Sequence, residues 1–337
     1  MNEQALPVTT RPGFRGFLLR LALVLCTGTI FVVFSELMFW GRYDFAHKAV
    51  SDLVPTIIVY SFFAYAFLII IHVFRVSNLY ALFMAGAVFG WLCEGVFVQT
   101  MYDDFPLNIS FTGLAWHSIL TVCCGWYLFR RVLLLENPVS TMKASAVGGL
   151  LWALWSVWWW VDKGLVSTPG EYAAYALITG VILIVCLRIS AMIPSSIFRP
   201  SRKEIYTISI IFLLYYFFVT IKASNLAFFV LPVCIGLAFY ALSANKERES
   251  ATDVIQQLDG KVRPWNYVTL LVMPVVSIIV YTLLYYAYLR LKTGPVFYIV
   301  LVPAGFILFL VSYAKMVWKA KEFGSPPSAD QEMELPK

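Results

Sequence analysis

The sequence predicts an all-α fold, a polytopic bundle of about ten transmembrane helices. Hydrophobic residues make up 61% of the 337 residues and charged residues only 13%, about half of the ~25% that is typical of a soluble domain. Apolar stretches of the ~20 residues needed to cross the hydrocarbon core recur along the whole chain. Lys and Arg fall mainly in alternate connections between these stretches, which is typical of a multi-pass membrane protein.

Ten stretches have the length and apolar character of a membrane span. They are Phe17–Trp40, Leu53–Phe74, Leu79–Met101, Phe111–Leu134, Ala144–Val161, Tyr172–Ile193, Ile205–Lys222, Leu226–Ala244, Tyr267–Leu289 and Pro295–Val317. The first follows a short basic stretch, is too long for the core of a signal peptide and lacks a small-residue cleavage site. We therefore expect it to stay attached as a signal anchor.

The distribution of basic residues predicts the orientation of the bundle. With the N-terminus placed inside, nineteen of the 25 Lys and Arg residues fall in inner segments. The six outer ones are Arg42, Lys48, Lys163, Lys222, Arg290 and Lys292. This positive-inside bias predicts that both termini are cytoplasmic and that the protein lies in the plasma membrane. The net charge of +6 thus reflects topology, and without a block of five basic residues we expect no nucleic-acid partner.

Glu36, Glu94 and His117 are almost the only ionisable side chains deep within the predicted spans. A charge at the centre of a bilayer costs ~2.5–3.5 kcal/mol on insertion scales, so such residues usually face a bundle interior or cavity. At ~1.5 Å per residue they lie roughly 6, 10 and 9 Å below the outer ends of the first, third and fourth spans. Three separate spans thus place an ionisable group at about one depth, in the outer leaflet.

Small residues on the third and fourth spans predict that Glu94 and His117 meet. Each stripe repeats every four residues, and such stripes allow helices to pack closely. The stripes are Gly86, Gly90 and Glu94 in one span and Gly113, His117, Thr121 and Gly125 in the other. The connection Tyr102–Ser110 makes the two spans a hairpin, so a Glu94–His117 hydrogen bond is expected.

Polar and aromatic residues near this pair are candidates for substrate contact. They are Trp91, Gln99, Tyr102, Asp103, Trp116, Thr121, Trp152 and Trp155. The alternatives are an ordinary wet loop for the polar residues near the hairpin and an interfacial aromatic belt for the tryptophans of the fifth span.

The second half of the chain has few candidate functional residues within its spans. Its last four spans have almost no charge in their interiors and contain Pro232, Pro274 and Pro303, where kinks are tolerated. We expect residues 1–323 to form one transmembrane domain, with the site-bearing helices in 17–161 and scaffold-like helices in 172–317. Residues 324–337 are expected to be a disordered cytoplasmic tail, and Asn245–Asn266 a solvated linker with or without a short interfacial helix.

Two groups of residues could bind a metal or form disulfides. All six cysteines lie within apolar spans, where cysteine behaves as a small hydrophobe, so no disulfide framework is expected. Two carboxylates and a histidine could complete a zinc or iron site. No HExxH or paired-histidine spacing exists, however, and no metal or cofactor is expected.

The stretch from Phe89 to Phe97, FGWLCEGVF, followed by Trp116-His117 and Gly125-Trp126-Tyr127, resembles the glutamate-dependent intramembrane proteases of the CAAX-processing type and the related PrsW-like proteases. The resemblance covers about forty residues, and the diacidic motif of that group is absent. It implies that Glu94 works with a catalytic water and that His117 lies beside it.

Three functions fit the sequence. The first is an intramembrane acid–base enzyme, hydrolase-like, that acts on a lipid or membrane-anchored substrate with Glu94 and His117 as catalytic groups and Glu36 as a second acid. The second is a proton-coupled secondary transporter, because ten spans with both ends inside is a common permease layout. The third is a packing or assembly partner without chemistry. Membrane lipids are the expected partners in each case.

Overall fold

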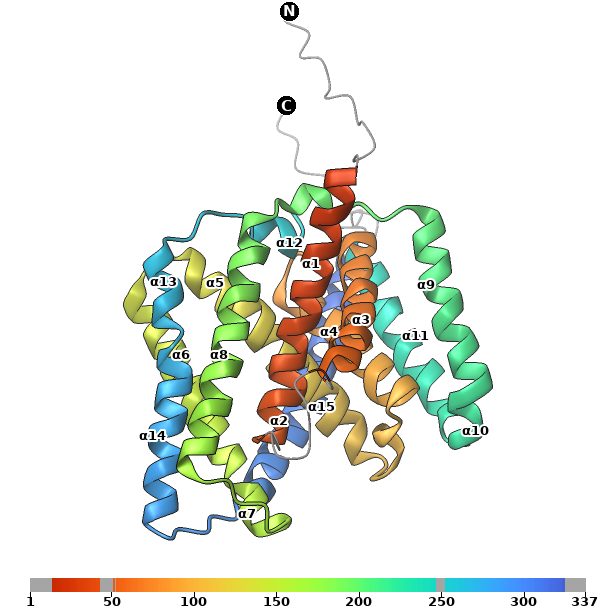
Figure 1. Cartoon of the computed structure of the whole chain (residues 1–337). Coiled ribbons are helices and arrows are strands. Elements are labelled where there is room, and N and C mark those ends of the chain that lie inside the picture. The colour runs from red at the N-terminus through yellow and green to blue at the C-terminus, as the bar shows by residue number, and fades with distance from the viewer. Residues whose placement is uncertain (1–13, 43–50, 52, 247–251, 325–337) are drawn as a thin grey trace, which may run out of the picture.

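The chain folds into a bundle of helices without strands in the part of the chain that the structure describes. The structure is a computed structural model that describes residues 14–42, 51, 53–246 and 252–324. Ten helices in these ranges are long and apolar enough to cross a membrane, which confirms the predicted polytopic all-α fold (Figure 1). The predicted tail beyond Gly324, Lys48 and most of the N-terminal basic stretch lie outside the described residues.

The first five spans include several segments that are joined end to end. Their elements are α1 (Phe14–Val32), η1 (Val33–Leu37), α2 (Met38–Trp40), α3 (Leu53–Phe74), α4 (Leu79–Trp91), η3 (Leu92–Phe97), η4 (Thr100–Tyr102), η5 (Ile109–Leu128), α5 (Phe129–Leu134), α6 (Pro138–Ser156) and α7 (Trp158–Asp162). The third span ends at Phe97 and not at Met101 as predicted. The reason is that Gln99 takes a left-handed conformation, with φ of 71°, which stops the helix.

The last five spans are more regular. Their elements are α8 (Pro169–Met192), η6 (Ser195–Ile197), α9 (Arg202–Tyr215), η7 (Tyr216–Thr220), α10 (Ile221–Ala223), α11 (Ala227–Lys246), α12 (Val254–Gln257), α13 (Pro264–Thr269), α14 (Val272–Tyr286) and α15 (Thr293–Gly324). The linker predicted at Asn245–Asn266 contains the short helix α12, which Asp253 caps by accepting from the Gln256 amide.

Local sequence signals fix several helix starts. Asn78 and Asn137 cap α4 and α6 with their side chains, and Pro138 occupies the first turn of α6. Thr168 with Glu171 forms a capping box at α8, and Ser201 with Glu204 forms another at α9. These caps satisfy amide groups that would otherwise be unpaired at the edge of the hydrocarbon.

Among the residues that the structure describes, four segments have π-helical hydrogen bonding, in which an amide donates to the carbonyl five residues back. The Met38 amide donates to the Val33 carbonyl, Val98 to Cys93 and Phe129 to Cys124. These bonds close η1, η3 and η5, and η7 is the fourth such segment. The π-helix is rare and mostly a single turn, often at a functional site, whereas η5 extends over 20 residues.

The core lies where α1, α3, α4 and η5 pack together. α4 packs along η5, α1 along α3 and α8, α14 along α6 and α8, and α11 between α4 and α15. Buried residues from nearly every span belong to one continuous apolar cluster. α9 and α14 stand at opposite edges of the bundle (Figure 1).

Ten spans bring the start of α1 and the end of α15 to the same side of the bundle. We call this the terminal side and the other the distal side. The assignment of the terminal side to the cytoplasm stays a prediction from the positions of Lys and Arg.

Candidate functional site

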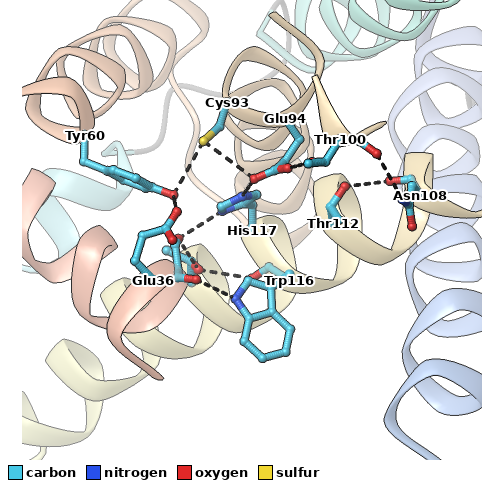
Figure 2. Close-up of polar contacts among 11 residues, drawn as sticks. Glu36, Tyr60, Cys93, Glu94, Thr100, Asn108, Thr112, Trp116 and His117 are labelled. Atoms are coloured by element: carbon cyan, nitrogen blue, oxygen red, sulfur yellow. Dashed lines mark hydrogen bonds and ion pairs between the residues drawn. The ribbon is translucent and has the colours of Figure 1, made fainter. Parts of the chain in front are cut away.

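Glu94 and His117 meet directly in the distal half of the bundle, as predicted. The Glu94 Oε1 atom lies 2.8 Å from His117 Nε2, and His117 Nδ1 lies 3.0 Å from the Ser35 hydroxyl. The side chain of His117 is 3% exposed and that of Glu94 is 10% exposed. The imidazole is therefore held at both nitrogens by residues of two other spans (Figure 2), and both members of the pair are buried, Glu94 slightly less so.

The hydrogen bonds around His117 fix which ring nitrogen carries the proton. The Thr121 hydroxyl donates to the Trp116 carbonyl at 3.1 Å, and Ser35 lies 2.8 Å from the Thr121 oxygen. All of these bonds form together only if Ser35 donates to Thr121 and His117 Nδ1–H donates to Ser35. His117 Nε2 and Glu94 then share one further proton, either as acid and neutral imidazole or as carboxylate and imidazolium.

A second branch connects Glu94 to Glu36. Thr100 donates to Glu94 Oε2, and Tyr60 donates to Glu36 Oε1. The Cys93 thiol lies between the two branches and can donate its one proton to either, with Sγ 3.5 Å from the Tyr60 oxygen and 3.9 Å from Glu94 Oε1. The three residues predicted as catalytic thus belong to one hydrogen-bonded network from four spans, shown in Figure 2.

The π-helical segments position this network. Glu36 lies in η1, Glu94 in η3 and His117 in η5. The wider turn of η3 leaves the Gly95 and Val96 carbonyls to other donors, the Tyr102 and Thr220 hydroxyls, at 2.8 Å each. The backbone beside Glu94 is therefore held by side chains from outside its own helix.

Glycine allows the two helices of the hairpin to approach. A Cβ added at Gly90 would lie 2.2 Å from the Gly113 carbonyl oxygen and 2.9 Å from His117 Cβ. One at Gly86 would lie 2.6 Å from the Ser118 hydroxyl oxygen. The small-residue stripe therefore packs against the His117 helix as predicted, and this contact brings Glu94 within reach of the imidazole.

Aromatic side chains cover the distal side of the network. The Trp116 indole donates to the Ser35 carbonyl at 3.0 Å, and its ring packs against Phe39 and Trp155 with centroids 4.7 and 4.5 Å apart. Trp155 and Trp159 both donate to the Phe39 carbonyl. Trp155 of α6 and Trp159 of α7 thus hold the end of α2, and they also lie near the expected membrane interface.

The other residues predicted to contact substrate lie around the network or away from it. Thr121 and Trp116 take part in it, and Tyr102 binds the Gly95 carbonyl. The Trp91 indole donates instead to the Ile109 carbonyl at 3.1 Å and packs against Phe309 of α15.

Three more of these residues have no recorded contact with the network. Trp152 is buried and packs against Tyr172 and Tyr175 of α8. Gln99 occupies the left-handed turn after η3, and Asp103 is exposed. The structure therefore brings together only part of the predicted substrate set.

Sequence reasoning missed Ser35, Tyr60, Cys93 and Thr100. Ser35 and Cys93 each precede one of the glutamates, and Tyr60 is followed by Ser61 within an otherwise apolar span. A search for every polar group in the spans, not only ionisable ones, would have singled out these neighbours.

The chemistry of the site also suits a metal ion. One ligand atom each from Cys93, Glu94 and His117 lies within 4.8 Å of the others, and all three residues are buried. Thiolate, carboxylate and imidazole together match the ligands of zinc, and three protein ligands are the number found in catalytic zinc sites. In this structure, however, Glu94 and His117 bond to each other, so a metal would have to replace that hydrogen bond.

Comparison of the whole chain with known proteins does not identify this site. Neither a family model, a curated protein nor a solved structure matches the chain. Its function must therefore be inferred from the residues themselves.

Proposed function

We propose that the protein is an intramembrane acid–base enzyme that hydrolyses a lipid or membrane-anchored substrate, with Glu94 and His117 as the catalytic pair. The observation that carries the proposal is the 2.8 Å bond between Glu94 and an imidazole whose other nitrogen is held by Ser35. Activated catalytic groups commonly have this arrangement: the reactive group bonds to a partner that exchanges its proton, and a third group orients the partner.

The proposed step uses the shared proton of the pair. Glu94, as carboxylate beside the imidazolium form of His117, accepts a proton from water while the water oxygen bonds to the electrophilic carbon of the substrate. The bond from that carbon to the leaving group then breaks, and Glu94 returns the proton to the leaving group. One water is consumed, and the pair ends in its starting state.

Burial makes this pair suitable for the step. His117 is almost fully enclosed, so its hydrogen bonds act without competition from solvent. Glu94 keeps a tenth of its side chain exposed, and Glu36 is partly exposed beside it. The proposed substrate approaches Glu94, while His117 acts from behind it.

The resemblance to glutamate-dependent intramembrane proteases supports the same assignment. In that comparison Glu94 matches the glutamate that works with water and His117 the histidine beside it. Cys93 stands immediately before Glu94, and the missing diacidic motif separates this chain from the group. The proposal therefore extends to the reaction class, hydrolysis within a membrane, and leaves the scissile bond to experiment.

The test compares variants in proteoliposomes that contain a panel of fluorogenic acyl esters and a lipidated reporter peptide. Glu94→Gln keeps the shape of the side chain but removes its basicity, and His117→Ala removes the partner. Each is expected to lower turnover by about 10²-fold or more, the usual contribution of general acid–base catalysis. Reactions in ¹⁸O-labelled water should place the label in the acid product of the wild type.

Asp162→Asn serves as the matched control, because Asp162 is an exposed carboxylate on the distal side that pairs only with the neighbouring Lys163 among the described residues. It should keep full activity. The assignment fails if correctly folded Glu94→Gln turns over any substrate of the panel at the wild-type rate.

A proton-coupled carrier is the second candidate, supported by the row of polar groups Glu36, Tyr60, Cys93 and Glu94, in which the Cys93 proton can go to either neighbour. Buried relays of this kind mark proton paths in transporters. Tyr60→Phe breaks this row without touching the Glu94–His117 bond. It should abolish substrate flux driven by a pH gradient in a carrier, whereas an enzyme that uses only the pair should lose less than about tenfold in turnover.

A further inference from the structure

An apolar groove of about 540 Å³ opens between α1, α3 and α9 in the terminal half of the bundle. Its walls include Leu21 and Leu25 of α1, Ile58 and Phe62 of α3, and Ile208 of α9. The volume lies within the ~300–1,000 Å³ range of small-molecule sites. Arg20 of the groove and Glu36 of the site are sixteen residues apart on one helical span, which is ~24 Å at 1.5 Å per residue. The charged end of the groove is thus far from Glu36, whereas Ile58 and Ser61 of its wall flank Tyr60 in the sequence; neither Glu94 nor His117 lines the groove.

The groove faces the hydrocarbon of the membrane. Leu21, Leu25 and Ile58, on its walls, are 43%, 39% and 60% exposed. Within a bilayer the surroundings of such residues are acyl chains, and water is excluded from apolar surface of this kind. A hydrocarbon chain is therefore the natural occupant, and the remaining question is which head group it carries.

Charged residues at the terminal end of the groove indicate the charge of that head group. Arg20, Lys203 and Glu204 line it there, so cations exceed anions by one. The Glu204 carboxylate is already engaged, because it pairs with Arg20 and accepts from the Ser201 amide at 2.6 Å. Lys203 is exposed and forms no ion pair with the part of the chain that the structure describes. It is the group available to a ligand.

We propose that this groove binds one anionic phospholipid, with an acyl chain along α1 and α3 and the phosphate at Lys203. Basic pockets between spans on the cytoplasmic side bind anionic head groups in this manner, and the terminal side is the side that the Lys and Arg distribution assigns to the cytoplasm. Arg199 and Arg202, both exposed next to the groove, add to the positive potential that an anionic head group meets.

Native mass spectrometry of the full chain, purified in detergent and incubated with equal amounts of phosphatidylglycerol and phosphatidylcholine, tests the proposal. Wild type should retain one phosphatidylglycerol in preference to phosphatidylcholine. Lys203→Ala should lower that preference about fivefold, the size expected for one cation near an anionic surface. Leu25→Trp, which fills the groove, should remove the bound lipid of either kind.

Two variants control for general effects. Lys143→Ala removes an exposed lysine on the terminal side of α6, and Leu177→Trp adds a tryptophan at an exposed position of α8. Neither should change the retained lipid. The proposal is overturned if wild type retains both lipids equally, if Lys203→Ala keeps the preference, or if Lys143→Ala lowers it as much. Because no catalytic activity is measured, the result is independent of the proposed hydrolase.

Discussion

The third and fourth spans, which carry Glu94 and His117, differ from the seventh and tenth spans at the rim of the bundle in a way opposite to a soluble protein. The tenth span, in α15, is more apolar than the fourth, in η5 and α5, yet only 17% of its apolar window is buried against 67% for the fourth. The seventh span is likewise 17% buried and the third 83%. Lipid is as apolar as leucine, so exposed positions can be wholly apolar while the interior accommodates polar groups. The least lipid-exposed spans are therefore where chemistry is to be expected.

The largest expected difference is between the Glu94–His117 pair of the site and the Arg20–Glu204 pair of the rim. His117→Ala leaves Glu94 buried without its partner and should lower the free energy of unfolding by about 3–5 kcal/mol. Arg20→Ala removes the partner of Glu204 at the rim, where the two side chains are 17% and 30% exposed, and should cost about 0–1 kcal/mol. Reversible unfolding in mixed detergent and dodecyl sulfate micelles measures both. Equal costs would contradict the difference in burial between the two pairs.

A glycine in each region gives the next largest contrast. Gly90→Ala should cost about 2–3 kcal/mol, because its Cβ would collide with the backbone of the fourth span. Gly236→Ala in α11 meets no atom within 4 Å and should be neutral or stabilising by up to about 1 kcal/mol, since alanine is the better helix former. Thermal unfolding of the two variants in one detergent checks the sign. A neutral Gly90→Ala would mean that the hairpin is not close-packed.

Substitution of one buried serine in each region distinguishes an effect on stability from an effect on turnover. Ser35→Ala and Ser277→Ala each remove a buried hydroxyl, Ser277 being 2.6 Å from the Tyr172 oxygen, and each should cost about 1 kcal/mol of stability. Only Ser35→Ala should also lower turnover, by about tenfold or more, because it releases His117 Nδ1. The ¹⁵N chemical shifts of the imidazole should change in Ser35→Ala alone. An unchanged turnover would reduce Ser35 to a packing role.

The fold could be read from the sequence because hydropathy and length suffice to locate spans in a membrane. Leu53–Phe74 agrees with the structure at both ends. The third span was predicted too long because its end depends on the backbone conformation of Gln99, which residue types alone do not set. The π-helical turns were also unforeseen, because they depend on donors such as Thr220 that arrive from distant parts of the chain.

The central pair of the site was predictable and its surroundings were not. Gly90 and Glu94 lie on one face of their helix, and Gly113 and His117 on one face of the next, so a hairpin alone brings the pair together. Tyr60 enters from a third span through the packing of α3 on α1 and α4. No spacing in the sequence specifies that contact, and the same holds for Ser35.

The smallest effect on stability is expected for a lipid-facing residue of the tenth span. It tests whether the low burial of that span reflects contact with lipid. Ile299 of α15 is 70% exposed. Its side chain therefore contacts mainly lipid in both the folded and the unfolded state, and Ile299→Ala removes similar contacts from each. It should change the free energy of unfolding by less than about 0.5 kcal/mol, because no hydrophobic driving force acts between helices in a bilayer. A cost of about 2 kcal/mol or more, the range of a buried isoleucine, would show instead that α15 is covered in the membrane by protein and not by lipid. In that case the rim would be an interface, and its low burial within the single chain would no longer mark it as scaffold.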